Sequence, residues 1–114
     1  MNALLKLKQM AEDTHGIYFY ITDTEKRSIQ VFNKIKDSVD YAWWVSANAV
    51  NSVTLDNGSE ITILPEDDAH ELLALPHSSA VFIESEDDVR EMADALRDTT
   101  DVLALVDPTS QELL

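Results

Sequence analysis

Four carboxylates recur at helical spacing in the last third of the chain. The intervals between them are four, three and four residues, which would place all four on one face of a helix, opposite an apolar stripe. Successive carboxylates would then rise by about 5 to 6 Å, close to two phosphate steps along a DNA strand. The spacing therefore predicts a phosphate-like row that occupies the basic groove of a nucleic-acid-binding protein: Asp87, Glu91, Asp94 and Asp98. The same spacing is also typical of the polar face of an ordinary amphipathic helix.

A second acidic group follows Pro65 and consists of Glu66, Asp67 and Asp68. Carboxylates near the start of a helix are stabilised by the helix macrodipole. The group lacks the alternating oxygen ligands and the central glycine of a calcium loop, so we predict no metal there. We expect it to form a second patch facing the same basic partner.

The adjacent tryptophans Trp43 and Trp44 are a different kind of candidate. On a helix they would lie about 100° apart, and on a strand they would point to opposite faces. We expect one ring to lie in the core and the other to be partly buried, and the alternative is that one of them is exposed. An exposed tryptophan is a typical anchor of a protein interface. This pair supports an alternative function, an accessory or assembly subunit that binds a partner, or a second copy of itself, through an apolar surface.

The remaining chemistry centres on His70. The segment His70–Ala74 shares the histidine and the glutamate that open the zincin motif, but alanine stands where the second histidine ligand is required. A small metal-dependent enzyme using His70 and nearby carboxylates is therefore a third hypothesis. With only Gly16 and Gly58 in the chain, no glycine-rich phosphate loop can form, and no Gly-x-Ser-x-Gly elbow is present. We expect a protein that is not an enzyme and that carries no cofactor and no metal.

The net charge of −14 is distributed unevenly along the 114 residues. Residues 1–50 hold six basic and six acidic side chains, whereas residues 51–114 hold sixteen acids against Arg90 and Arg97. A soluble domain of this size needs a net charge of only about 2 to 8 in magnitude. The excess predicts a basic partner protein and argues against direct binding to nucleic acid or to an anionic membrane.

Cysteine is absent, which excludes disulfides, thiol catalysis and thiolate metal sites. Lys6 and Lys8 interrupt the apolar start of the chain, so a signal peptide is not predicted, and no apolar run approaches the roughly 20 residues of a membrane span. We expect a cytoplasmic protein. Short, acidic, cysteine-free chains of this general character include phage and mobile-element proteins that block host defence.

The first half of the chain is expected to contain the elements that position the tryptophans. Apolar spacing predicts a helix over residues 3–13, and β-branched and aromatic residues predict a hairpin of strands 17–22 and 28–32. Residues 34–50 fit both a helical face and a strand alternation, and we favour the helix. Flanking apolar residues and Asn57-Gly58 predict a hairpin over 52–64 with a type I′ turn.

The second half is expected to position the acids. Pro65 and the acids after it predict a short helix to about Leu75. Residues 79–83, 87–98 and 102–106 predict a strand, a helix and a strand, which together form a βαβ unit. The fold class is α+β, with residues 1–114 in a single domain, a mixed sheet and about four helices.

Overall fold

The computed structural model describes residues 2–47, 50–68, 77–84 and 90–113. These residues form three α-helices: α1 (Ala3–Asp13), α2 (Glu25–Ser38) and α3 (Arg90–Arg97). They also form six strands: β1 (Ile17–Thr22), β2 (Tyr41–Ala47), β3 (Val50–Leu55), β4 (Glu60–Pro65), β5 (Ser78–Glu84) and β6 (Thr100–Val106). The fold is a single-domain α+β fold, as predicted.

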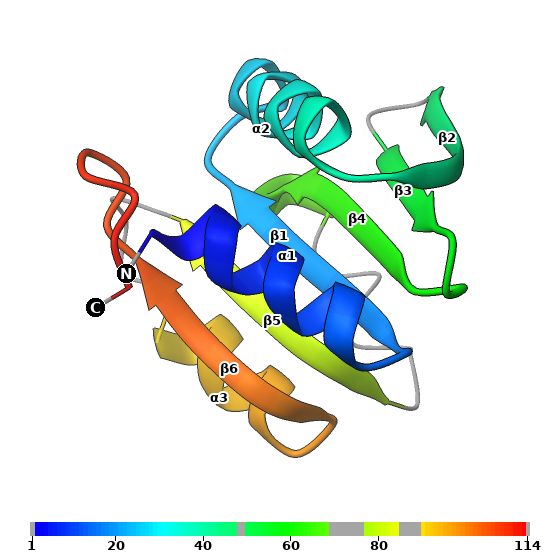
Figure 1. The fold of residues 1–114 in the computed structure, drawn as a ribbon. Helices are drawn as coiled ribbons and strands as arrows, with labels where there is room; N and C mark the ends of the chain where they lie inside the picture. The colour runs from blue at the N-terminus through cyan, green and yellow to red at the C-terminus, as the bar shows by residue number, and fades with distance from the viewer. Residues whose placement is uncertain (1, 48–49, 69–76, 85–89, 114) are drawn as a thin grey trace.

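All six strands belong to one mixed sheet in the order β2-β3-β4-β1-β5-β6 (Figure 1). β1 pairs in parallel with β4 and β5, and β5 pairs in parallel with β6. β3 pairs antiparallel with both β2 and β4, so it alone among the described strands runs in the opposite direction. The sheet therefore has two edges, β2 and β6.

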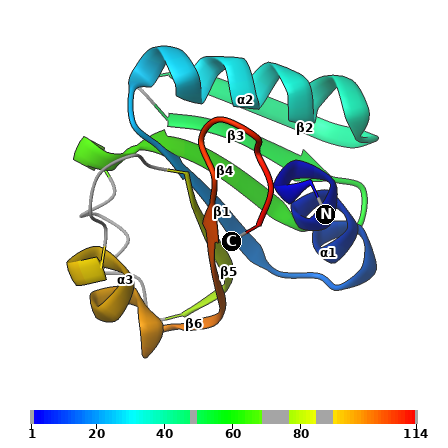
Figure 2. The same cartoon turned by 90° about the vertical axis from the view of Figure 1, so that its left-hand side faces the viewer.

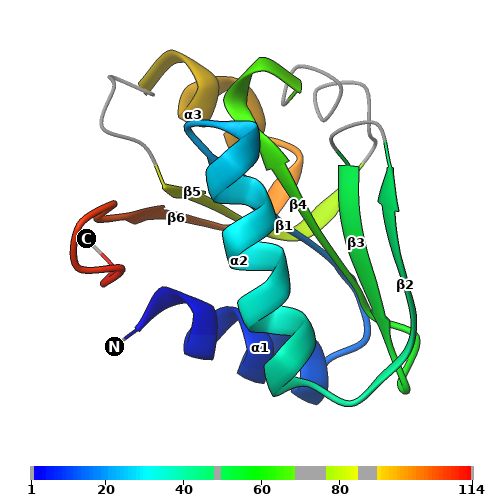
Figure 3. The same ribbon diagram turned by 90° about the horizontal axis from the view of Figure 1, so that it is seen from above.

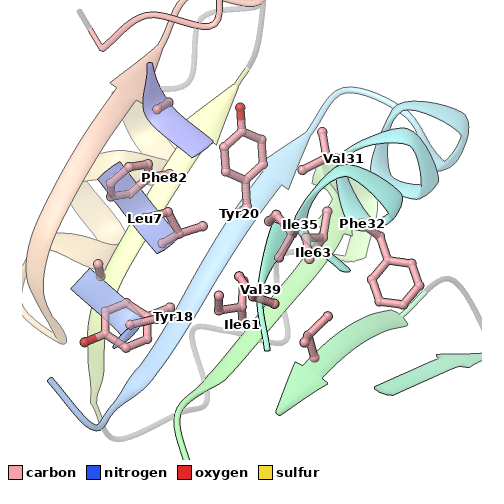
Figure 4. Close-up of a cluster of buried hydrophobic side chains, with 14 of the residues drawn as sticks. Leu7, Tyr18, Tyr20, Val31, Phe32, Ile35, Val39, Ile61, Ile63 and Phe82 are labelled. Carbon is pink, nitrogen blue, oxygen red and sulfur yellow. The ribbon is translucent and has the colours of Figure 1, made fainter. Parts of the chain in front are cut away.

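Helices cover both faces of the sheet, with α1 and α2 on one side and α3 on the other (Figure 2). β1 lies in the middle and is buried on both faces, which explains its nearly unbroken apolar sequence. Tyr18 and Tyr20 point towards α1 and α2, where side chains of helices and strands fill the space between the layers (Figure 4). Phe19 and Ile21 alternate to the opposite face and pack with Leu96 of α3.

The predicted strand over residues 28–32 is wrong, because this segment lies inside α2. Thr24 caps the helix by accepting a hydrogen bond at Oγ1 from the main-chain N–H of Arg27 (3.1 Å). Val31, Phe32 and Ile35 are then buried at helical spacing. An alternation over only five residues is compatible with both a strand and a helix. The cap at Thr24 and the apolar spacing over the longer segment identify the helix.

The predicted helix over residues 34–50 is also wrong over most of its length. α2 ends at Ser38, and Val39 is already extended, with φ −123° and ψ 153°. The run Tyr41–Ala47 is strand β2, in agreement with the preference of aromatic and β-branched residues for strands.

The hairpin over residues 52–64 is confirmed as the antiparallel pair β3 and β4, but its turn is not type I′. The Leu55 carbonyl accepts from the Gly58 N–H (3.0 Å), and the Leu55 N–H donates to the Ser59 carbonyl (2.8 Å). Gly58 has φ 87°, whereas Asn57 has no positive φ. The loop therefore has three residues and places only its last residue in the left-handed region.

The C-terminal βαβ unit is confirmed, since β5 and β6 are parallel and α3 lies between them in the chain. Of the predicted helix 87–98, residues 90–97 form α3 and Asp98 lies in the turn that follows. Of the predicted helix after Pro65, only residues 66–68 are described, and they form a short 3₁₀ turn. The expected count of about four helices is thus corrected to three α-helices among the described residues.

The start of α1 and the segment after β6 lie next to each other (Figures 1 and 2). Isolated bridges join Asn2 to Glu112 and Val106 to Leu113, and the Ala3 N–H donates to the Gln111 carbonyl (2.8 Å). The C-terminal segment therefore covers the end of β6. Within the described residues, no helix is both long and apolar enough to span a membrane.

Candidate interaction site at the edge strand β2

Strand β2 lies at an edge of the sheet and has an unusual sequence for that position (Figure 3). Its inner side pairs with β3, and no other described strand pairs with its outer side. Edge strands are normally protected by charges, proline or bulges, because their free N–H and C=O groups can pair with another chain. The seven residues Tyr41–Ala47 contain no charged side chain and no proline, and the bulge between Tyr41 and Trp43 leaves regular pairing from Trp43 onwards.

Large apolar side chains are exposed along this strand. Trp43 is 61% exposed, Val45 51%, Trp44 45% and Tyr41 40%. Trp43 and Val45 lie on one face of the strand and Trp44 on the other, because side chains alternate along a strand. The expectation that one tryptophan lies in the core is wrong, because β2 is an edge strand and a large part of both rings is exposed.

Trp44 is held in place by neighbours on α2. Its ring packs edge-on against Phe32, with ring centroids 6.0 Å apart and an interplanar angle of 63°. The Lys36 ammonium lies 4.4 Å from the centroid of the Trp44 ring and 5.3 Å from that of Phe32. The cation–π contact and the edge-on packing give Trp44 a fixed orientation while leaving it accessible.

Polar side chains tie β2 to the rest of the domain. The Ser46 hydroxyl donates to Asn51 Oδ1 across the β2–β3 pair (2.6 Å), and Asn51 Nδ2 donates to the Ser28 hydroxyl of α2 (3.4 Å). Asn51 and Ser28 are both buried. The strand therefore has a rigid base, which reduces the entropy cost of ordering it when a partner binds.

An acidic hollow adjoins the start of β2. A cavity of about 270 Å³ is lined by Glu12, Asp40, Leu55, Asp56 and Asn57. Asp40 directly precedes β2, and Leu55 is the β3 partner of Tyr41. Three carboxylates thus surround the hollow, and Glu12 is paired only loosely, at 3.8 Å, with Lys8.

The β3–β4 turn fixes the wall of this hollow against the end of α1. Asn57 Nδ2 donates to the main-chain carbonyls of Ala11 (2.8 Å) and Glu12 (3.2 Å), which are left unpaired by the helix end. The Ser59 hydroxyl also donates to the Ala11 carbonyl (2.8 Å). These hydrogen bonds join residues 45 or more positions apart in the sequence, and they keep Glu12 beside Asp56.

The predicted phosphate-like row is described only in part. Asp87 lies outside the described residues, and Glu91 belongs to α3. Asp94 and Asp98 are exposed, and Asp94 lies 3.4 Å from the Arg97 guanidinium. Asp98 falls in the turn after α3, not in the helix itself.

The structure separates the end of this row at Asp98 from the second acidic group. Glu66, Asp67 and Asp68 follow β4, whose last residue Pro65 pairs with Thr22 at the carboxyl end of β1. Asp98 lies two residues before Thr100, which pairs with Ser78 at the amino end of β5. Asp98 and the second acidic group therefore lie at opposite ends of parallel strands, about 20 Å apart along the strand direction at about 3.3 Å per residue.

The hypothesis of a metal-dependent enzyme depends on His70, which lies in the segment 69–76, outside the described residues. His77 Nε2 lies 3.1 Å from Asp101 Oδ1, and both side chains are exposed. Among the described residues, no three histidine or acidic side chains are grouped as a metal site would require.

One polar cluster was not anticipated from the sequence. Glu84, at the end of β5, is buried and accepts from Arg27 Nε (2.6 Å), Arg27 Nη2 (3.1 Å) and the Tyr20 hydroxyl (2.5 Å). Burial, together with the hydrogen bond to the Glu84 carboxylate, raises the pKa of Tyr20, and the hydrogen bonds to Glu84 raise the pKa of Arg27. With the amide oxygen of Gln111 turned towards them, Arg27 Nη2 and Lys34 Nζ also donate to that residue.

This cluster links one helix to two strands of the sheet. It joins α2 to β1 and β5 at the carboxyl ends of the strands, and the only sequence signal for it is a carboxylate closing an apolar strand. Because Glu84 already accepts three hydrogen bonds, we assign the cluster a role in stability.

Comparison with protein-family models, with curated proteins and with solved structures finds no significant match to this chain.

Proposed function

We propose that this protein is a non-enzymatic protein-binding module that takes up an extended segment of a partner beside β2. The observation that carries the proposal is the uncharged edge strand whose four large apolar side chains are exposed. An extended peptide added to a sheet edge gains affinity from main-chain hydrogen bonds and specificity from alternate side-chain contacts. Trp43 and Trp44 would be the anchors, since tryptophan dominates the binding energy of many interfaces.

The opposite edge of the sheet is less suited to this role. Val106 of β6 already bridges to Leu113, so part of that edge is occupied by the chain itself. The exposed apolar side chain there is Val102, at 40% exposure, without an aromatic neighbour on the strand. This contrast supports β2 as the binding edge and makes β6 a matched control.

Affinity capture from a lysate of the source cells tests the proposal. The double variant Trp43→Ser/Val45→Thr removes the two exposed apolar side chains on one face of β2 but keeps a β-prone residue at position 45. We expect it to lose partners that the wild type and Val102→Thr both retain in high salt. Equal capture by all three proteins would refute binding at β2.

The nucleic-acid mimic remains a second candidate function, supported by the exposure of Asp94 and Asp98 on the α3 side of the molecule. It predicts a different outcome in the same experiment. A nucleic-acid-binding partner should then be lost in high salt and in Asp94→Asn/Asp98→Asn, and retained by Trp43→Ser/Val45→Thr.

A further inference from the structure

The acidic hollow and the edge strand are neighbours, and together they restrict the chemistry of the partner. Asp40 precedes the first residue of β2, and Leu55 in the hollow is the cross-strand neighbour of Tyr41. A strand added outside β2 would lie about 4.8 Å from it, and hence about 10 Å from β3. Only a long side chain reaches across that distance, and lysine and arginine combine this length with a positive charge.

We infer that the partner segment is an extended basic chain that places a lysine or arginine in the hollow lined by Glu12, Asp40 and Asp56. Its apolar side chains contact Trp43 and Val45 on the exposed face of β2. This inference rests on the proposed function, because the hollow lies beside the strand that receives the segment.

The charge of the whole molecule favours this occupant over a second copy of the chain. The net charge of −14 attracts a basic segment over a long range, whereas a second copy brings the same negative charge. Moreover, β2 itself contains no lysine or arginine that could enter the hollow of another copy.

Selection from a displayed library of random twelve-residue peptides tests the inference on the intact 114-residue chain. We expect the recovered peptides to alternate β-branched or aromatic residues with lysine or arginine and to be lost on Trp43→Ser/Val45→Thr. Their affinity should fall about tenfold in Glu12→Gln/Asp40→Asn/Asp56→Asn, since each of three charge contacts at the edge of an interface contributes a factor of about 1.5 to 5. The matched control Asp67→Asn/Asp94→Asn/Asp98→Asn removes the same charge elsewhere and should bind within about twofold of wild type.

Other outcomes would distinguish two claims, binding at β2 and the basic character of the partner segment. In one such outcome, the recovered peptides require Trp43 for binding but contain no excess of basic residues and bind equally well to Glu12→Gln/Asp40→Asn/Asp56→Asn. That result would refute a basic partner segment, while binding at β2 would still hold. Failure to recover any peptide that depends on β2, from protein shown to be folded by circular dichroism, would overturn both. A dimer in sedimentation that Trp43→Ser dissociates would assign the edge to a second copy instead.

Discussion

Trp44 packs edge-on against Phe32, with ring centroids 6.0 Å apart, whereas its neighbour Trp43 points to the other face of β2 and is 61% exposed. Two adjacent residues of the same type therefore have different roles. Trp44 belongs partly to the packing of α2 on the sheet, and Trp43 is available to a partner.

Replacing each tryptophan with alanine should separate these roles. Trp44→Ala removes an aromatic pair and a cation–π contact and should lower the free energy of unfolding by about 1 to 2 kcal/mol. Trp43→Ala should change it by less than about 0.5 kcal/mol, as expected for an exposed side chain. Urea denaturation measures both, and equal losses would show that Trp43 is part of the packed structure.

The Arg27–Glu84 pair should be costly to break from one side only. Arg27→Met leaves the Glu84 carboxylate buried without its cation and should cost about 2 to 3 kcal/mol, less than a fully buried pair because Arg27 is 21% exposed. Arg27→Met/Glu84→Gln removes the unpaired charge but keeps an acceptor for Tyr20. The double variant should therefore be more stable than Arg27→Met in chemical denaturation, and a less stable double variant would contradict a charged Glu84 in the fold.

The raised pKa of Tyr20 predicts a loss of stability in alkali. The unfolded chain ionises this phenol near pH 10.0, whereas the folded state keeps it protonated, so its contribution is complete below pH 10 and is lost as the pH rises above that value. The slope approaches about 1.4 kcal/mol per pH unit for this one group. Burial also raises the pKa of Tyr18, which persists in Tyr20→Phe, so the difference between the two proteins isolates Tyr20. Parallel stability curves for wild type and Tyr20→Phe between about pH 9 and pH 11 would exclude this linkage.

Substitution of Gly58 should lower the stability of the fold because of the backbone conformation at this position. Its φ of 87° lies where residues with a Cβ are strained, and an added Cβ would lie 3.1 Å from the His15 ring. Gly58→Ala should destabilise the fold by about 1 to 2 kcal/mol, and Gly58→Asn by less, because asparagine tolerates this conformation better. The control Gly58→Ala/His15→Ala removes the contact and keeps the strain, so recovery of wild-type stability in thermal unfolding would assign the cost to the ring instead.

Local signals in the sequence predicted much of the fold. α1, the β3–β4 hairpin and the β5–α3–β6 unit each depend on spacing, caps or turns within about a dozen residues. α2 was partly missed because Ser28–Phe32 alternates over too few residues to distinguish the two periods. The same ambiguity assigned Tyr41–Ala47 to a helix.

The strand order depends on contacts far apart in the sequence, and no local pattern shows it. The placement of β1 between β4 and β5 leaves β2 at the edge, and this placement determines the exposure of Trp43. Glu84 and Arg27 are 57 residues apart, so their pairing also appears only in the folded chain. The tryptophans were therefore recognised as candidates from the sequence, while Tyr41, Val45 and the hollow beside them were not.

Hydrogen–deuterium exchange in the presence of a peptide selected by display tests binding at the edge strand most directly. We expect slower exchange of the main-chain amides of Tyr41–Ala47 when the peptide is bound, with unchanged exchange in β6 and no slowing in Trp43→Ser/Val45→Thr. Slower exchange confined to α3 and the turn at Asp98, with β2 unaffected, would contradict it and place the binding surface on the acidic face.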